Sequence, residues 1–164
     1  MEVSLKRIDL GDRHVLENLF PYYVYDMSEF MGWNPDSSGC YSFDSETINS
    51  YWQKPSHVPY FIFAGKELAG FALIRKYPDD PETYDIEQFF VLRKFKGQGI
   101  GKEALIEVLA KHPGKWQIRV LKENEPALKF WISAIRNVVG SGYQASLDID
   151  IDLEMHFIRF ETVS

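Results

Sequence analysis

A predicted strand that runs into a glycine-rich loop and then directly into a helix is the feature that most constrains this chain. Residues 83–92 are rich in aromatic and branched side chains and predict a strand, and Gly97, Gly99 and Gly101 follow at alternate positions. From Ile100 onward the apolar residues recur at helical spacing, which predicts an amphipathic helix. Glycines let a ligand approach the backbone closely, and a helix start presents unpaired N–H donors with the positive end of the helix dipole. The loop is therefore predicted to bind an anion.

Three phosphate-binding motifs compete for this loop. A P-loop would need glycine at position 96 and serine or threonine at 103, where the chain has Lys96 and Glu103. A dinucleotide fingerprint needs the spacing G-x-G-x-x-G, whereas the chain has G-x-G-x-G. The stretch from Lys96 to Gly101 resembles the acyl-CoA pyrophosphate loop of the GNAT N-acetyltransferases, R/Q-x-x-G-x-G/A, with lysine in the first position. Val91 stands five positions before the loop, as in that family.

A second stretch resembles the same family at the expected distance downstream. Residues 124–131 read N-E-P-A-L-K-F-W and are similar to the family's N-x-x-A-x-x-F-Y helix, which flanks the pantetheine arm of CoA. Trp131 stands where the family usually has tyrosine, whose phenol is proposed to protonate the departing thiolate. An indole N–H donates a hydrogen bond but is not such an acid. The resemblance therefore implies that water or another group supplies this proton, and Tyr84 and Tyr143 are the candidates.

The order of the predicted elements agrees with the resemblance. Alternation and helical spacing predict strands at 3–8, 60–64, 68–76, 83–92, 116–121, 138–147 and 153–161, and helices at 12–31, from 44 or 45, at 100–109 and at 124–135. Pro21 is expected to divide the first helix into two pieces, and an acidic loop at 148–152 is expected to join the last two strands. This order predicts an α/β fold with a mixed sheet of the α+β type. The resemblance implies that this is the GNAT acyl-CoA N-acyltransferase fold, in a single domain over residues 1–164.

The resemblance implies where acetyl-CoA, as co-substrate, would bind. Backbone groups of Phe89, Phe90 and Val91 would hold the pantetheine as an added strand would, and an N–H there would polarise the thioester carbonyl. The loop and the second motif would supply the other contacts: Lys96, Gly97, Gln98, Gly99, Ile100, Gly101, Lys102, Asn124 and Phe130. Plainer roles stay open beside these, namely a turn that needs glycine, surface lysines, a helix cap at Asn124 and a core aromatic at Phe130.

An amine acceptor would require a base, because an alkylamine with a pKa of about 10.4 is protonated at neutral pH. Glu87 is the first candidate and Asp85 the second. Strand alternation places both on the face of Phe89 and Val91, near the expected position of the thioester. A cross-strand ion pair is the alternative role for Glu87.

The aromatic segment at residues 20–33 is the candidate for acceptor recognition. In the family the first two helices cover the acceptor site, and here Asp26 and Glu29 lie among the aromatics. Such a surface suits a cationic amine through charge and cation–π contacts. The alternative is that many of these aromatics belong to the core.

The charge and the residue counts limit the classes of partner and the location that we expect. A net charge of −6 argues against nucleic acid, and no apolar run approaches the roughly 18 residues of a membrane span. The single cysteine, Cys40, suits a reducing compartment, so a cytoplasmic location is expected. The four histidines have no metal-ligand spacing, so no metal site is expected. A homodimer stays among the alternatives.

These patterns together predict an acetyl-CoA-dependent N-acetyltransferase. The acetyl group would pass to a primary amine of a small molecule or a peptide, by direct attack within a ternary complex. One alternative is a degenerate GNAT-fold protein that binds CoA as a sensor or scaffold without catalysis, which the tryptophan at position 131 favours. Another is an acidic protein-interaction domain that does not bind CoA.

Overall fold

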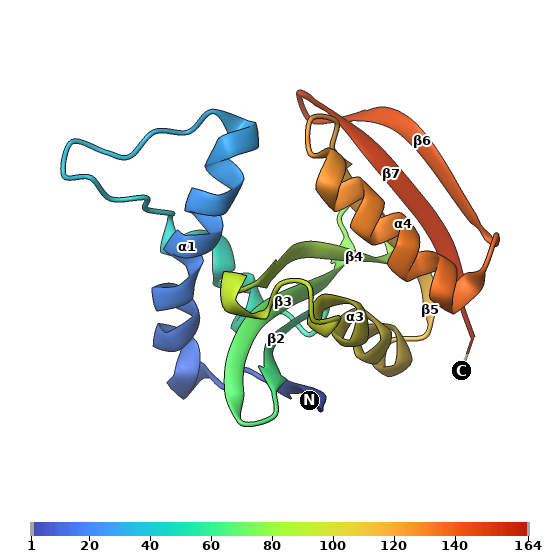
Figure 1. The fold of residues 1–164 in the computed structure, drawn as a ribbon, viewed down its shortest axis with the longest axis horizontal. Coiled ribbons are helices and arrows are strands. Elements are labelled where there is room, and N and C mark those ends of the chain that lie inside the picture. Colours follow the sequence, from blue (N-terminus) through green and yellow to red (C-terminus); the bar gives the residue numbers. More distant parts are fainter. Residues whose placement is uncertain (1, 164) are drawn as a thin grey trace.

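A seven-stranded mixed sheet forms the framework of the structure, a computed structural model that describes residues 2–163 (Figure 1). The strands are β1 (Val3–Arg7), β2 (His57–Ala64), β3 (Glu67–Tyr77), β4 (Asp80–Val91), β5 (Gly114–Leu121), β6 (Tyr143–Asp150) and β7 (Leu153–Thr162). They lie in the order β1-β2-β3-β4-β5-β7-β6, and every neighbouring pair is antiparallel except β4 and β5. The predicted α/β fold with a mixed sheet is confirmed.

Helices cover the two faces of the sheet. Helices α1 (Arg13–Met31) and α2 (Ser50–Gln53) pack on one face, and α3 (Ile100–Lys111) and α4 (Glu125–Val139) pack on the other. Each pair buries its own apolar cluster. We call them the α1 cluster, which includes Leu16, Phe20, Phe71 and Phe90, and the α3/α4 cluster, which includes Ala72, Leu105, Trp116 and Ile135. Phe71 and Ala72 are neighbours on β3 and fall in different clusters, as the alternation of a strand requires.

Pro21 lies inside α1 and does not divide it, so the expected break is wrong. Leu16, Phe20 and Val24 are spaced by four residues and form one buried stripe of the helix. A proline inside a helix costs about 3 kcal/mol, whereas burial of each such side chain contributes about 1.5–3 kcal/mol. The stripe therefore outweighs the proline, and the helix continues to Gly32, which ends it in the left-handed conformation.

The strand predicted at residues 138–147 is present, but both of its predicted limits are wrong. Its first two residues still belong to α4, because Val139 packs one turn beyond Ile135 against the α3/α4 cluster. β6 therefore starts later and runs further than expected. Most of the expected acidic loop is strand, and residues 151–152 alone form the turn to β7.

Strands β4 and β5 separate after a short parallel pairing. Residues 83–85 of β4 pair with residues 115–117 of β5, and the described part of the chain contains no further pair between them. Beyond this point the side of β4 that faces away from β3 has no neighbouring strand. Its backbone N–H and C=O groups there need another partner. The opening lies in the middle of the sheet and positions the site described below.

Glu87 is an extra residue in β4. In the pairing with β3, Leu73 lies opposite Gln88 and Ile74 lies opposite Ile86, so Glu87 stands opposite no residue. This is a β-bulge, which re-aims the side chains on either side of it.

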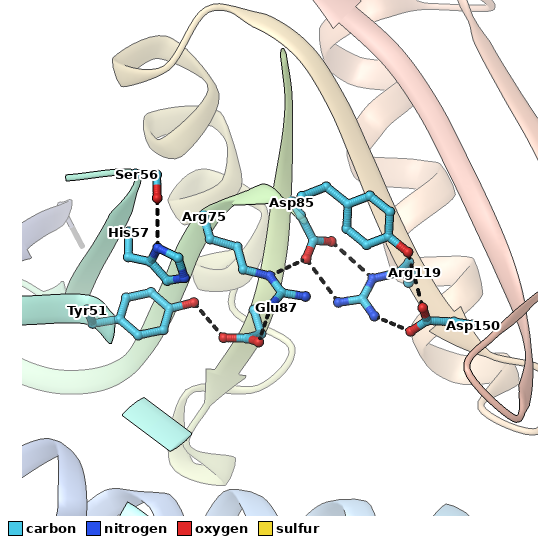
Figure 2. A network of polar contacts seen from close by, with 9 residues as sticks. Tyr51, Ser56, His57, Arg75, Asp85, Glu87, Arg119 and Asp150 are labelled. Carbon is cyan, nitrogen blue, oxygen red and sulfur yellow. Dashed lines mark hydrogen bonds and ion pairs between the residues drawn. The ribbon is translucent and has the colours of Figure 1, made fainter. Parts of the chain in front are cut away.

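The bulge changes which side chains share a face. Tyr51 of the α1 cluster donates a hydrogen bond to Glu87, and Asp85 points the same way (Figure 2). Phe89 and Val91 pack instead against the α3/α4 cluster. The prediction that these four side chains of β4 share one face is therefore wrong, because the extra residue shifts the alternation by one position.

Gly70 provides a test of the close approach of β3 and β4. A Cβ atom at this position would lie 1.9 Å from the backbone oxygen of Phe90, a contact that requires the strands to move. Gly70→Ala should lower the free energy of unfolding by about 3 kcal/mol, as measured by urea denaturation. Gly11→Ala is the matched control, because a Cβ there meets nothing within 4 Å. Equal stability of the two variants would contradict the proposed strand spacing.

Candidate active site

Two cavities meet beside the opening between β4 and β5. The first, the loop cavity, has a volume of about 700 Å³ and is lined by the glycine loop, the end of β4 and parts of α1 and α4. The second, the splay cavity, has a volume of about 600 Å³ and is lined by β4, β5, the end of α1 and the β6–β7 turn. We call the wall that the two cavities share the junction. Six residues line both: Tyr23, Met27, Phe89, Asn124, Ala127 and Trp131.

The loop cavity gathers eleven of the twelve residues predicted to bind the co-substrate. The exception is Gln98, whose side-chain amide donates to the carbonyl oxygen of Lys94 at 2.9 Å. Gly97 and Gly99 have φ angles of 76° and 77°, in the region that favours glycine. A Cβ on Gly101 would lie 3.1 Å from the ring of Phe130, so the helix start and this aromatic are in close contact. Their role in binding stays a prediction.

Alternate backbone groups of β4 point toward the junction. The N–H of Leu92 donates to the carbonyl of Ala69 on β3 at 2.8 Å, so Leu92 and Phe90 direct their backbone groups toward β3. The alternating residues Phe89 and Val91 direct theirs to the other side, where β5 has moved away. Two backbone amides therefore face the place where the cavities meet.

Cations beside the loop cavity are paired with a carboxylate of α1. Asp26 accepts a hydrogen bond from Arg93 at 3.0 Å and lies 3.8 Å from Nζ of Lys96. All three residues line the loop cavity, together with Lys102. An anion in this cavity would meet the start of α3 and these cations, in competition with Asp26.

Asp85 is the centre of a buried polar network (Figure 2). Its side chain has no exposed surface, and it accepts hydrogen bonds from Nε of Arg75 at 2.9 Å and from Nε and Nη2 of Arg119 at 3.1 and 3.0 Å. Arg119 also pairs with Asp150, which accepts from the phenol of Tyr77 at 3.1 Å. Burial alone would lower the pKa of Arg119, but the charges of the two aspartates raise it, so the guanidinium keeps its proton. The network joins β3, β4, β5 and β6.

Glu87 lines the splay cavity with both carboxylate oxygens held in place. Tyr51 donates to one oxygen at 2.8 Å, and Arg75 pairs with the other at 2.8 Å. Burial, and then the negative charge of Glu87, raise the pKa of Tyr51 well above its ordinary value, so this phenol remains a donor. The ion pair considered as the alternative for Glu87 is therefore present, and the carboxylate is still partly exposed to the cavity.

A phenol and an indole occupy the junction. Tyr23 donates a hydrogen bond to Oε1 of Gln88, and burial followed by the charge of Glu87 raises the pKa of Tyr23. Trp131 is buried, with its ring centroid 5.0 Å from that of Phe89. A phenol with a raised pKa donates hydrogen bonds but gives up its proton reluctantly.

The two tyrosines predicted as proton donors lie elsewhere. Tyr143 accepts a hydrogen bond from Arg136 at 3.0 Å and lines a separate groove with residues 115–117 at the start of β5, whereas the splay cavity is lined by residues 118–121. Tyr84 stacks on Trp116, with the ring centroids 4.9 Å apart. The structure brings neither phenol to Glu87.

Sequence reasoning missed the partners of the two candidate bases. Arg75 follows the apolar run at residues 68–74 of β3, which was a signal available for it. Arg119 only continues the polar alternation of β5, so its buried role carried no such signal. Tyr23 and Tyr51 carried no local signal, because each meets β4 across a long stretch of chain.

Neither a membrane-spanning helix nor a metal-binding cluster is found in the described part of the chain. Among residues 2–163, no helix is both long and apolar enough to cross a membrane. The same range holds no cluster of three or more His, Cys, Asp or Glu side chains able to bind a metal ion.

Comparison with known proteins gives one family and several related structures. The acetyltransferase (GNAT) family profile matches residues 22–132. An acetyltransferase from Thermus thermophilus is similar in structure, with a TM-score of 0.71 and 16% identity over 98% of this chain and 97% of that one. Spermidine N-acetyltransferase from Vibrio cholerae, in complex with CoA and spermine, has a TM-score of 0.69 and 13% identity over 98% and 95%. A GNAT family acetyltransferase from Elizabethkingia anophelis with acetyl-CoA bound has a TM-score of 0.59 and 19% identity over 97% of each chain. A search of curated protein sequences finds no significant match.

The buried network makes a stability prediction. Arg119→Met would leave Asp85 buried with only one of its two arginines, and it should lower the free energy of unfolding by about 3 kcal/mol. Arg93→Met is the matched control. Arg93 is 72% exposed and pairs with Asp26, so its loss should change stability by less than about 1 kcal/mol. Chemical denaturation measures both, and a similar small loss in both variants would show that Asp85 does not depend on Arg119.

Proposed function

The chain belongs to the GNAT acetyltransferase family, and from this premise we propose that it transfers the acetyl group of acetyl-CoA to a primary amine by direct attack within a ternary complex. The observation that carries the proposal is the meeting of the loop cavity and the splay cavity at six shared residues. This arrangement suits a donor and an acceptor bound at the same time, because holding both in contact makes the attack effectively unimolecular.

The loop cavity fits the donor. Gly97 and Gly99 leave open space beside their backbone, since a Cβ on either would meet nothing within 4 Å. The start of α3 offers N–H groups and positive potential to a pyrophosphate. The backbone N–H groups of Phe89 and Val91 would accept the pantetheine in place of a neighbouring strand. One of them would donate to the thioester oxygen as negative charge develops there.

Glu87 is the proposed base. Its carboxylate lies in the splay cavity near the junction, and Tyr51 and Arg75 fix its orientation. It would take a proton from the ammonium form of the acceptor, directly or through water, so that the neutral nitrogen can attack. Asp85 has no exposed surface, so it cannot meet an acceptor. We assign it a positioning role, exerted on Glu87 through Arg75.

The departing sulfur must take up a proton, and no side chain among the described residues of the site is a suitable acid for it. A bond forms between the amine nitrogen and the acetyl carbon, the carbon–sulfur bond breaks, and the departing sulfur needs a proton. Trp131 occupies the position of the usual phenol, and the raised pKa of Tyr23 makes it a weak acid. The nitrogen loses two protons in all, one from the ammonium group and one from the tetrahedral intermediate. We propose that Glu87 takes the first and passes it to solvent water, and that the second reaches the sulfur through water, while Tyr23 acts as a hydrogen-bond donor at the junction.

A sensor or scaffold that binds CoA without catalysis is the second candidate. The buried tryptophan at position 131 favours it, because the usual acid is missing. Glu87 in the splay cavity opposes it, since a CoA-binding scaffold has no use for a base beside the thioester.

Release of free thiol from acetyl-CoA, in the presence of a panel of primary amines, tests the proposal. The wild-type protein should release thiol, whereas Gly99→Glu should lose both thiol release and CoA binding, because a carboxylate would project into the loop cavity. Gly39→Glu is the control: its φ of 81° imposes the same backbone strain outside the cavity. Tight CoA binding without thiol release would favour the sensor, and unchanged CoA binding by Gly99→Glu would refute the loop assignment.

Glu87→Gln tests the base. This substitution keeps the shape of the side chain but removes proton acceptance, so kcat should fall by about 100-fold or more while the affinity for CoA stays within about twofold. Glu107→Gln, on the exposed side of α3, should change neither quantity. If Glu87→Gln turned over as fast as the wild type, the proton would have to pass directly to water.

A further inference from the structure

The splay cavity has apolar walls on two opposite sides. Met27 and Met31 come from the end of α1 and Trp33 from the segment just after it. Ile151, Leu153 and Met155 come from the β6–β7 hairpin. Trp33, Ile151 and Leu153 are 44%, 95% and 38% exposed, so their apolar surface is in contact with solvent beside the cavity. Two separate elements of the chain therefore present apolar side chains to one cavity.

The backbone of Ile151 has a conformation that β-branched residues disfavour. Its φ is 62°, and it is the one non-glycine residue with a positive φ among residues 2–163. A β-branched side chain in the left-handed region is a conformational outlier, and such outliers cluster at functional sites. Asp150, the preceding residue, is anchored by Arg119 and by Tyr77. The hairpin tip is thus tied to the buried network, and Ile151 lines the cavity in a backbone conformation that carries a cost.

The charges of the cavity favour a cation. Asp85, Glu87 and Asp150 supply three carboxylates against the two guanidinium groups of Arg75 and Arg119, so the network carries a net charge of −1. Asp79 adds another carboxylate to the lining. The only cations among the described lining residues are these two arginines, and both already bond carboxylates. The carboxylate of an amino acid would find no unpaired cation there.

We propose, on the basis of the proposed function, that the acceptor is a small primary amine carried on an apolar body. The ammonium group is attracted to Glu87, and the apolar body lies between the end of α1 and the tip of the β6–β7 hairpin. A cavity of about 600 Å³ is the size of a small-molecule site, which selects a compact amine over a peptide. A polyamine, whose further charges would face the apolar walls, is disfavoured.

A panel of acceptors tests the proposal through kcat/KM for thiol release. The panel holds phenethylamine and hexylamine as apolar amines, spermidine and putrescine as polyamines, lysine as an amino acid, and a short peptide with a free N-terminus. The apolar amines should exceed every other class by at least about tenfold. A preference for the polyamines, lysine or the peptide would overturn the inference while leaving the acetyltransferase activity established.

Ile151→Asn tests the hairpin wall without straining it, because asparagine tolerates a positive φ. KM for phenethylamine should rise by about fivefold or more, with KM for acetyl-CoA unchanged. Ile149→Asn is the matched control: it lies on the same hairpin, is exposed and does not line the cavity. An equal effect of the two substitutions would overturn the assignment of the hairpin tip.

Calorimetry separates failure of this inference from failure of the proposed function. Phenethylamine should bind to the protein saturated with CoA, and Ile151→Asn should weaken that binding. Binding of this kind without thiol release would refute the acetyltransferase and keep the apolar amine site. Thiol release with other amines, in the absence of phenethylamine binding, would do the reverse.

Discussion

Asp85 lies at the last residue where β4 and β5 are paired, and its carboxylate is fully enclosed by protein. Desolvating an unpaired charge would be costly, so the two arginines that reach it from β3 and β5 are required for its burial. The ion pairs of Asp85 with these two arginines therefore lie where β4 and β5 begin to diverge. Asp85 orients Glu87 through Arg75, and it anchors Asp150 at the β6–β7 hairpin through Arg119. The position of the opening, of the candidate base and of the hairpin wall all depend on it.

The opening itself explains why two cavities can meet inside a sheet. A continuous sheet would satisfy both sides of β4, whereas the divergence leaves the backbone of Phe89 and Val91 facing a space between two layers. One ligand can enter that space from the glycine loop and another from the hairpin side, and the junction residues Tyr23 and Trp131 touch both paths. The geometry thus follows from strand pairing rather than from any single side chain.

Much of the fold followed from local patterns, and the errors had tertiary causes. The strand, the loop and the start of α3 were predicted because glycine spacing and apolar periodicity act over a few residues. The break at Pro21 was wrong because a buried stripe of α1 outweighs the lost hydrogen bond. The predicted face of the Glu87 side chain was wrong because the bulge exists only in the pairing of β4 with β3. Tyr143 was a candidate acid in the sequence, and the structure packs it against the α3/α4 cluster, at the opposite end of β5 from the splay cavity.

The sequence by itself determined the glycine loop and the helix that follows it, since alternate glycines and apolar periodicity specify backbone geometry within a short segment. The tertiary structure decided the rest of the site. Tyr51 meets Glu87 across 36 positions of the chain, Arg119 meets Asp85 across 34, and Tyr23 meets Gln88 across 65. Which side chains meet over such separations depends on strand register and helix packing, and those are set by the burial of the whole chain rather than by any local pattern.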